Sequence, residues 1–336
     1  MVNSHTLSWA WGLVLAWVVG GLALVVNNSD HLVVLSHGIM GGAKDLAYLA
    51  EQLRSRGCLV LVSKANALLN SLHGIERGAR NLRQEIDDII LQSAEDHAIT
   101  RISFVGNSLG GIYARYAVKL YAENKPESIK FHKFMSIATP HLAVSFDEHN
   151  YLHQEFGLPI PNALKRIVAR TMGTTGRELF MLDDGGKEEP LLFRMATDEA
   201  FLSPLRQFSE RRLYANLKHD FVVPLGTAAF LNKNEVGELR SKHNAQSGIV
   251  AVLTTEPSSS SSSSSSSTTL QRMKEGLDSL GWQKQIVHFP GTLPIAHNKI
   301  AALRKDPEFL FTKILGTSEG EYVMVHAANW LTASSS

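Results

Sequence analysis

The stretch 102-ISFVGNSLGGIYARYAV-118 places the pentapeptide Gly106-Asn107-Ser108-Leu109-Gly110 between an apolar run and a helical pattern. The run before it predicts a buried strand, and the residues after Ser108 have the apolar spacing of a helix. A serine in a strand-to-helix turn of this kind is typical of a nucleophile elbow, in which small residues at Gly106 and Gly110 let the two elements approach closely. The pentapeptide alone also occurs in ordinary glycine-rich turns, so its context carries the prediction.

The segments around this turn alternate between strand and helix patterns. A short β-branched run that ends in a small-residue turn predicts the first strand, and an amphipathic stretch that ends at Gly57 predicts the first helix. This rhythm is typical of a mostly parallel, doubly wound α/β sheet. The predicted strands are 31–38, 58–65, 101–106, 131–140, 211–217, 247–256 and 282–290, with helices at 43–57, 74–96 and 109–123.

Two segments interrupt the alternation. Residues from about 141 to 210 predict a helix in two pieces about Gly173 and a further short helix at 198–210. An insertion after a strand is often a cap or lid, and extra packing helices are the alternative. Ten serines, Ser258 to Ser267, have no apolar surface to bury, so we expect a flexible loop at about 256–269 without chemistry.

The composition is that of a globular chain without a strong charge bias. The 336 residues are 44% hydrophobic and 19% charged, which suffices for a large core. A formal charge of +1, from 33 basic and 32 acidic side chains, lacks the basic footprint of a nucleic-acid binder. Cys58 is the single cysteine, which excludes an intrachain disulfide and cysteine-based zinc sites and slightly favours a reducing compartment. Nothing in the sequence indicates an obligate protein partner.

The first 30 residues differ from the remaining domain, 31–336. Leu7 to Val26 carry no charge, and as a helix they would span ~30 Å, the thickness of a bilayer's hydrocarbon core. The first lysine or arginine is Lys44, so the basic start of a signal peptide is missing. We therefore expect a membrane anchor and an intracellular, membrane-associated protein. A cleaved signal and a buried apolar element are the alternatives, and the orientation stays open.

The partners of a nucleophilic serine follow from the strand order. In this architecture an acid and then a histidine lie beyond the ends of later strands. Asp220 is the first carboxylate after the strand 211–217, whereas three other aspartates lie in the insertion: Asp183, Asp184 and Asp198. We predict Asp220 as the acid, with a backbone-capping turn aspartate as the alternative.

A general base is expected after the last strand. His297 lies in the loop that follows residues 282–290 and stands immediately before a helical pattern. We predict that it activates Ser108, with a helix-capping or surface histidine as the alternative. His288 lies inside the strand and reads as a packing residue. His219 and His326 are weaker competitors.

The oxyanion of the tetrahedral intermediate needs two backbone N–H donors. The elbow assigns one of them to Leu109, and the loop after the first strand, 36-SHGIMGG-42, offers the other at Gly38 or Ile39. His37 is expected to support this loop by hydrogen bonding. His141 reads as a structural or pocket residue. Because no H-E-x-x-H, G-K-[ST] or G-x-G-x-x-G motif occurs, we expect no metal and no cofactor.

Five ordered segments resemble the eukaryotic "putative serine esterase" family of lipase-like α/β hydrolases, which includes fungal monoacylglycerol lipases. They are HLVVLSHGIMGGAKDLAYLAEQL, FVGNSLGGIYARYAV, SIATPHLAV, HDFVVPLGTAAF and IAHNKIAAL, and they span roughly residues 31 to 305. The resemblance implies the α/β-hydrolase fold, the roles already given to Ser108, Asp220 and His297, and an acylglycerol substrate. The serine run and the apolar N-terminus depart from the family pattern.

The sequence therefore predicts a serine-dependent carboxylic ester hydrolase, a lipase whose substrate is a lipid ester at a membrane surface. A phospholipase or acyltransferase would use the same triad, so these activities remain alternatives. A membrane-tethered binding protein without turnover is the alternative from another class.

Overall fold

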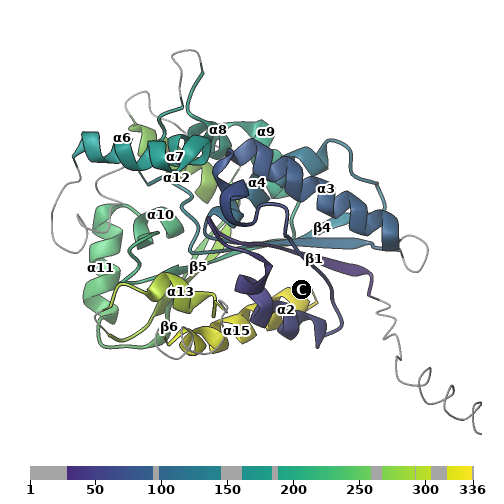
Figure 1. Cartoon of the computed structure of the whole chain (residues 1–336). Coiled ribbons are helices and arrows are strands. Elements are labelled where there is room, and N and C mark those ends of the chain that lie inside the picture. Colours follow the sequence, from purple (N-terminus) through teal and green to yellow (C-terminus); the bar gives the residue numbers. More distant parts are fainter. Residues whose placement is uncertain are drawn as a thin grey trace, which may run out of the picture.

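The computed structural model describes residues 29–93, 98–144, 161–183, 188–258, 267–291, 293–303 and 316–334. In this part of the chain a seven-stranded sheet has the order β2-β1-β3-β4-β5-β7-β6 (Figure 1). All neighbouring pairs are parallel except β6 and β7. The strands are β1 (His31–Ser36), β2 (Leu59–Val62), β3 (Arg101–Asn107), β4 (Lys130–Ile137), β5 (Glu210–Asn216), β6 (Gly248–Thr255) and β7 (Trp282–His288). The predicted α/β class with a mostly parallel sheet is confirmed.

Burial on both faces explains the apolar strands. Side chains of a strand alternate between the two faces, so Leu32 and Val34 enter one apolar core while Val33 and Leu35 enter the other. Central strands of a parallel sheet are covered by helices on both sides, and they therefore read as continuous apolar runs. The prediction of a buried strand at 58–65 is wrong in one respect. Because β2 is an edge strand, only Val60 within it is buried, and its other three residues are partly exposed.

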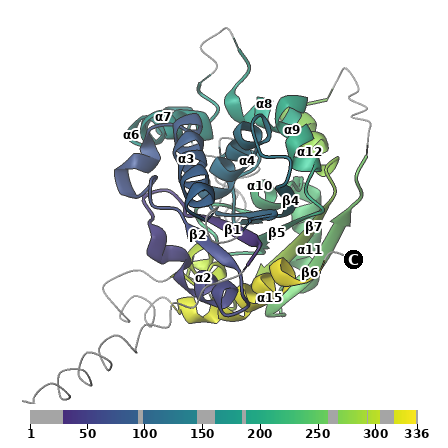
Figure 2. The ribbon, with the colours of Figure 1, turned by 90° about the vertical axis from the view of Figure 1, so that its right-hand side faces the viewer.

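Helices cover both faces of the sheet, as Figure 2 shows along the strands. One layer contains α3 (Ile75–Ser93), α4 (Leu109–Ala122), α8 (Leu191–Thr197), α9 (Glu199–Arg206) and α12 (Thr269–Asp278). The opposite layer contains α2 (Ala47–Arg54), α13 (Ala296–Ile300) and α15 (Glu321–Thr332). Further elements are η1 (Ala43–Leu46), η2 (Leu68–Leu72), α6 (Asn162–Thr171), α7 (Gly173–Leu179), α10 (Leu225–Ala229), α11 (Lys233–His243) and η4 (Thr317–Gly320).

The first helix ends as its sequence indicates. Gly57 adopts a left-handed φ of 84°, and the N–H of Cys58 returns to the carbonyl of Leu53. Only glycine enters this conformation without strain, so it closes the helix and directs the chain into β2.

The insertion contains the expected helix in two pieces. α6 and α7 meet at Gly173, whose φ of 65° requires glycine or a strained residue. α8, which the sequence analysis did not separate, and α9 pack on the sheet side with α4 and α12. For α8 and α9 the structure therefore agrees with the packing-helix alternative, while movement of α6 and α7 as a lid stays a prediction.

Two sequence predictions concern segments beyond the structural description. The apolar stretch from Leu7 to Val26 and most of the serine run lie outside the described residues. Among the residues that are described, none of the helices has both the length and the apolar character needed to cross a bilayer.

Candidate active site

Ser108 occupies a tight turn between β3 and α4. Its backbone has φ 55° and ψ −127°, a combination that a non-glycine residue adopts only under strain. The N–H of Ser108 donates to the carbonyl of Ile137 at 2.8 Å, which holds the turn against β4. Leu109 is the first residue of α4. This conformation is the one expected of a nucleophile elbow, since it projects the serine from the end of the strand.

The glycines that flank Ser108 are required by close backbone contacts. A Cβ at Gly106 would lie 2.2 Å from the Cα of Gly111, and a Cβ at Gly110 would lie 2.1 Å from the carbonyl oxygen of Ser36. Neither neighbour is a flexible side-chain end, so the backbone itself would have to move. The small residues therefore allow α4 to pass directly over β3 and β1.

Asp220 follows β5 and is 2% exposed. One carboxylate oxygen, Oδ1, accepts hydrogen bonds from the N–H groups of Val222 at 3.0 Å and Val223 at 2.7 Å. The other, Oδ2, accepts from the side-chain amide of Asn216 at 2.7 Å and lies 3.1 Å from Nδ1 of His297. These four contacts fix the carboxylate in one orientation.

His297 is the second residue of α13 and is also buried. Because the neighbouring Oδ2 of Asp220 only accepts, Nδ1 of His297 carries the ring proton and Nε2 is left as an acceptor. The loops that carry the pair are joined as well, through a β-bridge between Asp220 and Ile295 and a hydrogen bond of 3.1 Å from Ala296 N–H to the carbonyl of His219. The pair thus has the tautomer that a general base requires.

The three predicted residues lie beyond the carboxyl ends of β3, β5 and β7, which are parallel and open to one edge of the sheet. The structure brings Asp220 and His297 into contact. Among the described residues, Ser108 Oγ forms no hydrogen bond with His297. Catalytic hydrogen bonds are often long before substrate binds, so the assignment of Ser108 and His297 to one triad stays a prediction.

The predicted oxyanion donors lie around Ser108. Leu109 begins α4, so its N–H has no partner within that helix. The carbonyl of Gly38 is held by Nδ1 of His37 at 2.9 Å and by the N–H of Gly41 at 3.1 Å. In a trans peptide the N–H of Ile39 points opposite to this carbonyl. A Cβ at Gly38 would lie 2.8 Å from the Cβ of Ser108, which shows how closely this loop approaches the serine.

The supporting role predicted for His37 is confirmed by its hydrogen bond to Gly38. His141 is fully buried, and its ring nitrogens contact Ser136 Oγ at 2.8 Å and the Arg115 guanidinium at 3.3 Å. Burial, then the neighbouring positive charges of Arg115 and Lys284, lower the pKa of His141 well below its usual value. An enclosed imidazole with a lowered pKa and two side-chain partners agrees with the structural reading rather than with a base.

Arg115 is itself fully buried, and burial lowers its pKa to about 9. Its guanidinium donates to the carbonyl of Met195 at 2.5 Å, which ties α8 to α4. The side chain therefore links the insertion to the elbow helix.

The weaker candidates have other partners. His288 contacts the carbonyl of Gln246 at 2.5 Å, and His326 contacts the hydroxyl of Tyr214 at 2.8 Å. Asp183 accepts from the N–H of Leu191, and Asp198 stands at the N-cap of α9. His219 lines a cavity of about 270 Å³ beside the Asp220–His297 pair, together with Phe289, Pro290, Gly291, Leu293, Ile295, Ala296 and Lys299.

Asn216 is a site residue that sequence reasoning missed. Its side-chain amide donates a hydrogen bond to Asp220. The only signal in the sequence was its position at the end of a buried strand, four residues before the acid.

Within the described ranges no group of three or more His, Cys, Asp or Glu side chains could hold a metal ion. The expectation of cofactor-free chemistry stays a prediction.

A comparison with known protein families gives a match over part of the chain. Residues 26–234, more than half of the chain, match the family described as "Putative serine esterase (DUF676)". The chain belongs to this family. The matched range contains Ser108 and Asp220 and ends before His297. The description of the family is that of a serine esterase, and the sheet topology together with this membership confirms the α/β-hydrolase fold.

Within the aligned segments, the named relatives are 25–29% identical to this chain. Two are from Saccharomyces cerevisiae: "Putative lipase YDL109C", 28% identical over 214 residues, and "Putative lipase ROG1", 29% identical over 226 residues. The alignments cover 61% and 64% of this chain but only 31% of each relative. A solved structure, carboxyl esterase 2 from Tuber melanosporum, has a TM-score of 0.48 and 12% identity, with 91% of this chain and 79% of that chain covered.

Proposed function

We propose that the protein is a serine hydrolase of lipid esters, with acylglycerols as its substrate class. Ser108 Oγ attacks the ester carbonyl and passes its proton to Nε2 of His297, which Asp220 orients through Nδ1. The tetrahedral oxyanion accepts hydrogen bonds from the N–H groups of Leu109 and Ile39. His297 then returns the proton to the departing alcohol, which leaves an acyl group on Ser108.

The second half of the reaction repeats these transfers with water. His297 accepts a proton from a water molecule as its oxygen attacks the acyl carbonyl, and the second tetrahedral intermediate collapses to release the fatty acid. The proton returns to Ser108, so the enzyme is regenerated. The overall reaction consumes one water and yields an alcohol and a carboxylic acid.

One observation carries the proposal: a serine at φ 55° and a buried Asp220–His297 pair share one edge of the sheet. A structural turn has no need for a strained serine, and a structural ion pair has no need to lie at the same edge. The lipid substrate is supported by exposed apolar side chains next to each site segment. Met40 lies in the loop 36–42 that carries the proposed oxyanion donor Ile39, Phe221 follows Asp220, and Leu293 precedes His297.

A fluorophosphonate probe tests the nucleophile, because it modifies only an activated serine. We expect covalent labelling of the wild-type chain and none of Ser108→Ala. Equal labelling of folded Ser108→Ala, or an unlabelled folded wild type, would refute the nucleophile. Hydrolysis of mono-, di- and triacylglycerols, compared with phospholipids and with acyl transfer to an added alcohol, then decides the substrate class.

We also propose membrane association inside the cell through the apolar stretch from Leu7 to Val26. Its length matches the hydrocarbon thickness of a bilayer. Deletion of residues 1–26 should then release the protein from the membrane fraction. Unchanged sedimentation with membranes would contradict this anchor.

A further inference from the structure

Helix α6 exposes several of its apolar residues to solvent, although a helix of a globular protein normally buries them against the core. Leu164, Ile167 and Val168 are 47%, 56% and 38% exposed, whereas Lys165 and Ala169 face the protein interior. Residues three and four apart share a face of a helix, so the three exposed side chains form one apolar stripe. A surface helix normally shows the opposite arrangement, in which the apolar stripe faces the core.

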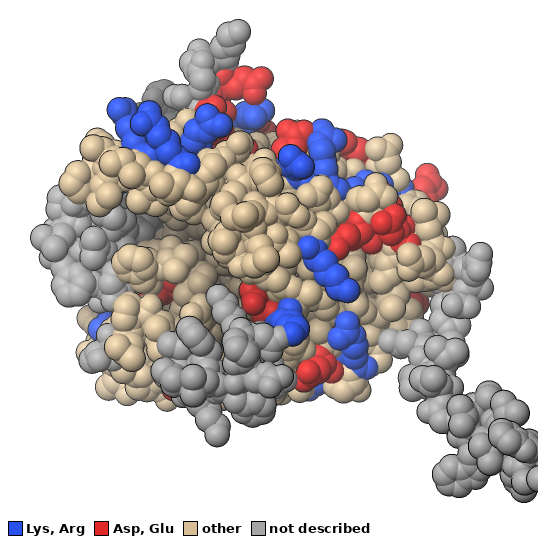
Figure 3. Space-filling model, viewed as in Figure 1, with Lys and Arg blue, Asp and Glu red and all other residues tan. Residues whose placement is uncertain are grey.

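Positive charges border this stripe. Arg166 and Arg170 are exposed on α6, and Arg177 is exposed on α7. The residues of α6 include no aspartate or glutamate. Figure 3 shows lysine and arginine side chains gathered along the margin of the molecule over α6 and α7, above a hollowed part of the surface. A helix with an exposed apolar stripe and a basic flank is typical of one that lies in the interface of an anionic bilayer.

We propose that α6 docks this protein on an anionic phospholipid bilayer. Leu164, Ile167 and Val168 enter the acyl boundary, and Arg166 and Arg170 contact headgroup phosphates. A protein partner would also cover an apolar stripe, but it would give no reason for a helix whose charged residues are all positive. The proposal goes beyond the proposed function, since docking requires neither Ser108 nor turnover.

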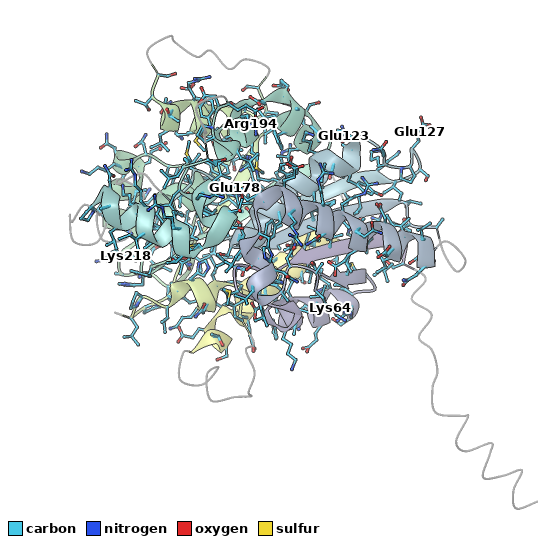
Figure 4. All side chains as sticks on the ribbon, turned by 45° about the horizontal axis from the view of Figure 1, so that its top comes forward. Lys64, Glu123, Glu127, Glu178, Arg194 and Lys218 are labelled. Atoms are coloured by element: carbon cyan, nitrogen blue, oxygen red, sulfur yellow. The ribbon has the colours of Figure 1, made fainter. Side chains whose placement is uncertain are left out.

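The test uses the full chain and a probe at a single position. Because Cys58, the only natural cysteine, is 3% exposed, an environment-sensitive thiol dye would label an introduced surface cysteine selectively. Ile167→Cys reports on the proposed face. Glu127→Cys is the matched control, because Glu127 lies in the α4–β4 connection at the far end of the domain (Figure 4). Both variants are made with Ser108→Ala as well, so that docking is measured separately from catalysis.

We expect vesicles of phosphatidylcholine with phosphatidylglycerol to shift the emission of the probe at position 167 to the blue and leave position 127 unchanged. Adding Arg166→Gln and Arg170→Gln should raise the lipid concentration at half-response roughly fivefold for each charge removed. Circular dichroism and the urea midpoint check that these variants fold.

Four results would overturn the proposal. They are no shift at position 167, an equal shift at both positions, an equal response to neutral phosphatidylcholine vesicles, and a shift that needs no vesicles but grows with protein concentration. The last of these would assign the face to a second copy of the chain.

Discussion

Replacing Asp220 by asparagine tests the proposed triad through the geometry of one carboxylate. Its Oδ1 accepts from Val222 and Val223, and its Oδ2 faces Asn216 and His297. Asparagine has a single oxygen. If that oxygen keeps the two backbone hydrogen bonds, the new amide group turns its hydrogens toward Asn216 and His297.

The amide would then donate to Nδ1 of His297, and the ring proton would move to Nε2. In that tautomer His297 cannot accept the proton of Ser108. The equivalent substitution in serine proteases lowers turnover by about 10⁴-fold, which corresponds to about 5.5 kcal/mol of barrier. The side-chain amide of Asn216 also loses its buried acceptor, which should reduce the free energy of unfolding by about 1–3 kcal/mol.

The rate of fluorophosphonate labelling and the urea unfolding curve measure these two effects separately. Asp198→Asn is the matched control, because Asp198 stands at the N-cap of α9 and makes no capping hydrogen bond with its side chain. We expect its labelling rate to equal that of the wild type. If Asp220→Asn kept a labelling rate within tenfold of the wild type while folded, the proposed role of Asp220 would be wrong.

Two further predictions concern stability. Gly110→Ala would place a Cβ 2.1 Å from the carbonyl oxygen of Ser36 and should lower the free energy of unfolding by about 1–3 kcal/mol or more. In Gly237→Ala, within α11, the added Cβ meets no atom within 4 Å, so this variant should raise the free energy of unfolding by about 1 kcal/mol. Equal urea midpoints for the Gly110→Ala and Gly237→Ala variants would contradict the packing argument. Burial raises the pKa of Glu178 to about 7 from 4.5, so the folded protein binds the proton more tightly than the unfolded chain. This stabilisation is complete below pH 4.5 and is lost as the pH rises through about 7, by up to about 3 kcal/mol. Glu178→Gln should therefore gain stability relative to the wild type between pH 5 and pH 8, and a difference that does not change with pH would rule this out.

Features set by local pattern were predictable from the sequence. The elbow at Ser108 required only a strand, two glycines and a helix start in the correct order, and the backbone of the structure has that form. Asp220 and His297 were placed by chain order, because parallel strands bring the residues after their ends to one edge of the sheet. The structure puts these two side chains in contact.

Features that depend on distant contacts were not predictable. Asn216 reads as an ordinary strand residue until Asp220 folds back onto it. The exposure of β2 depends on the strand order rather than on its apolar sequence. Likewise, the 3.6-residue period of α6 predicted a helix but not which face would be buried, because neighbouring elements decide that.

The proposed docking helix and the proposed oxyanion loop are joined by a short series of hydrogen bonds. On α7, which continues from α6, Thr175 donates to the carbonyl of Ser71 at 2.8 Å and accepts from the N–H of Gly74 at 2.9 Å. The hydroxyl of Ser71 accepts from the N–H of Met40 at 2.9 Å, directly after Ile39. Glu178, which is labelled in Figure 4, accepts a further hydrogen bond of 2.6 Å from the N–H of Ile75, the first residue of α3.

Contact alone does not couple two sites, because coupling requires an element with two arrangements. If α7 is such an element, vesicles should change the fluorophosphonate labelling rate of the wild type, and Thr175→Val should reduce that change while leaving the vesicle-induced shift at position 167 intact.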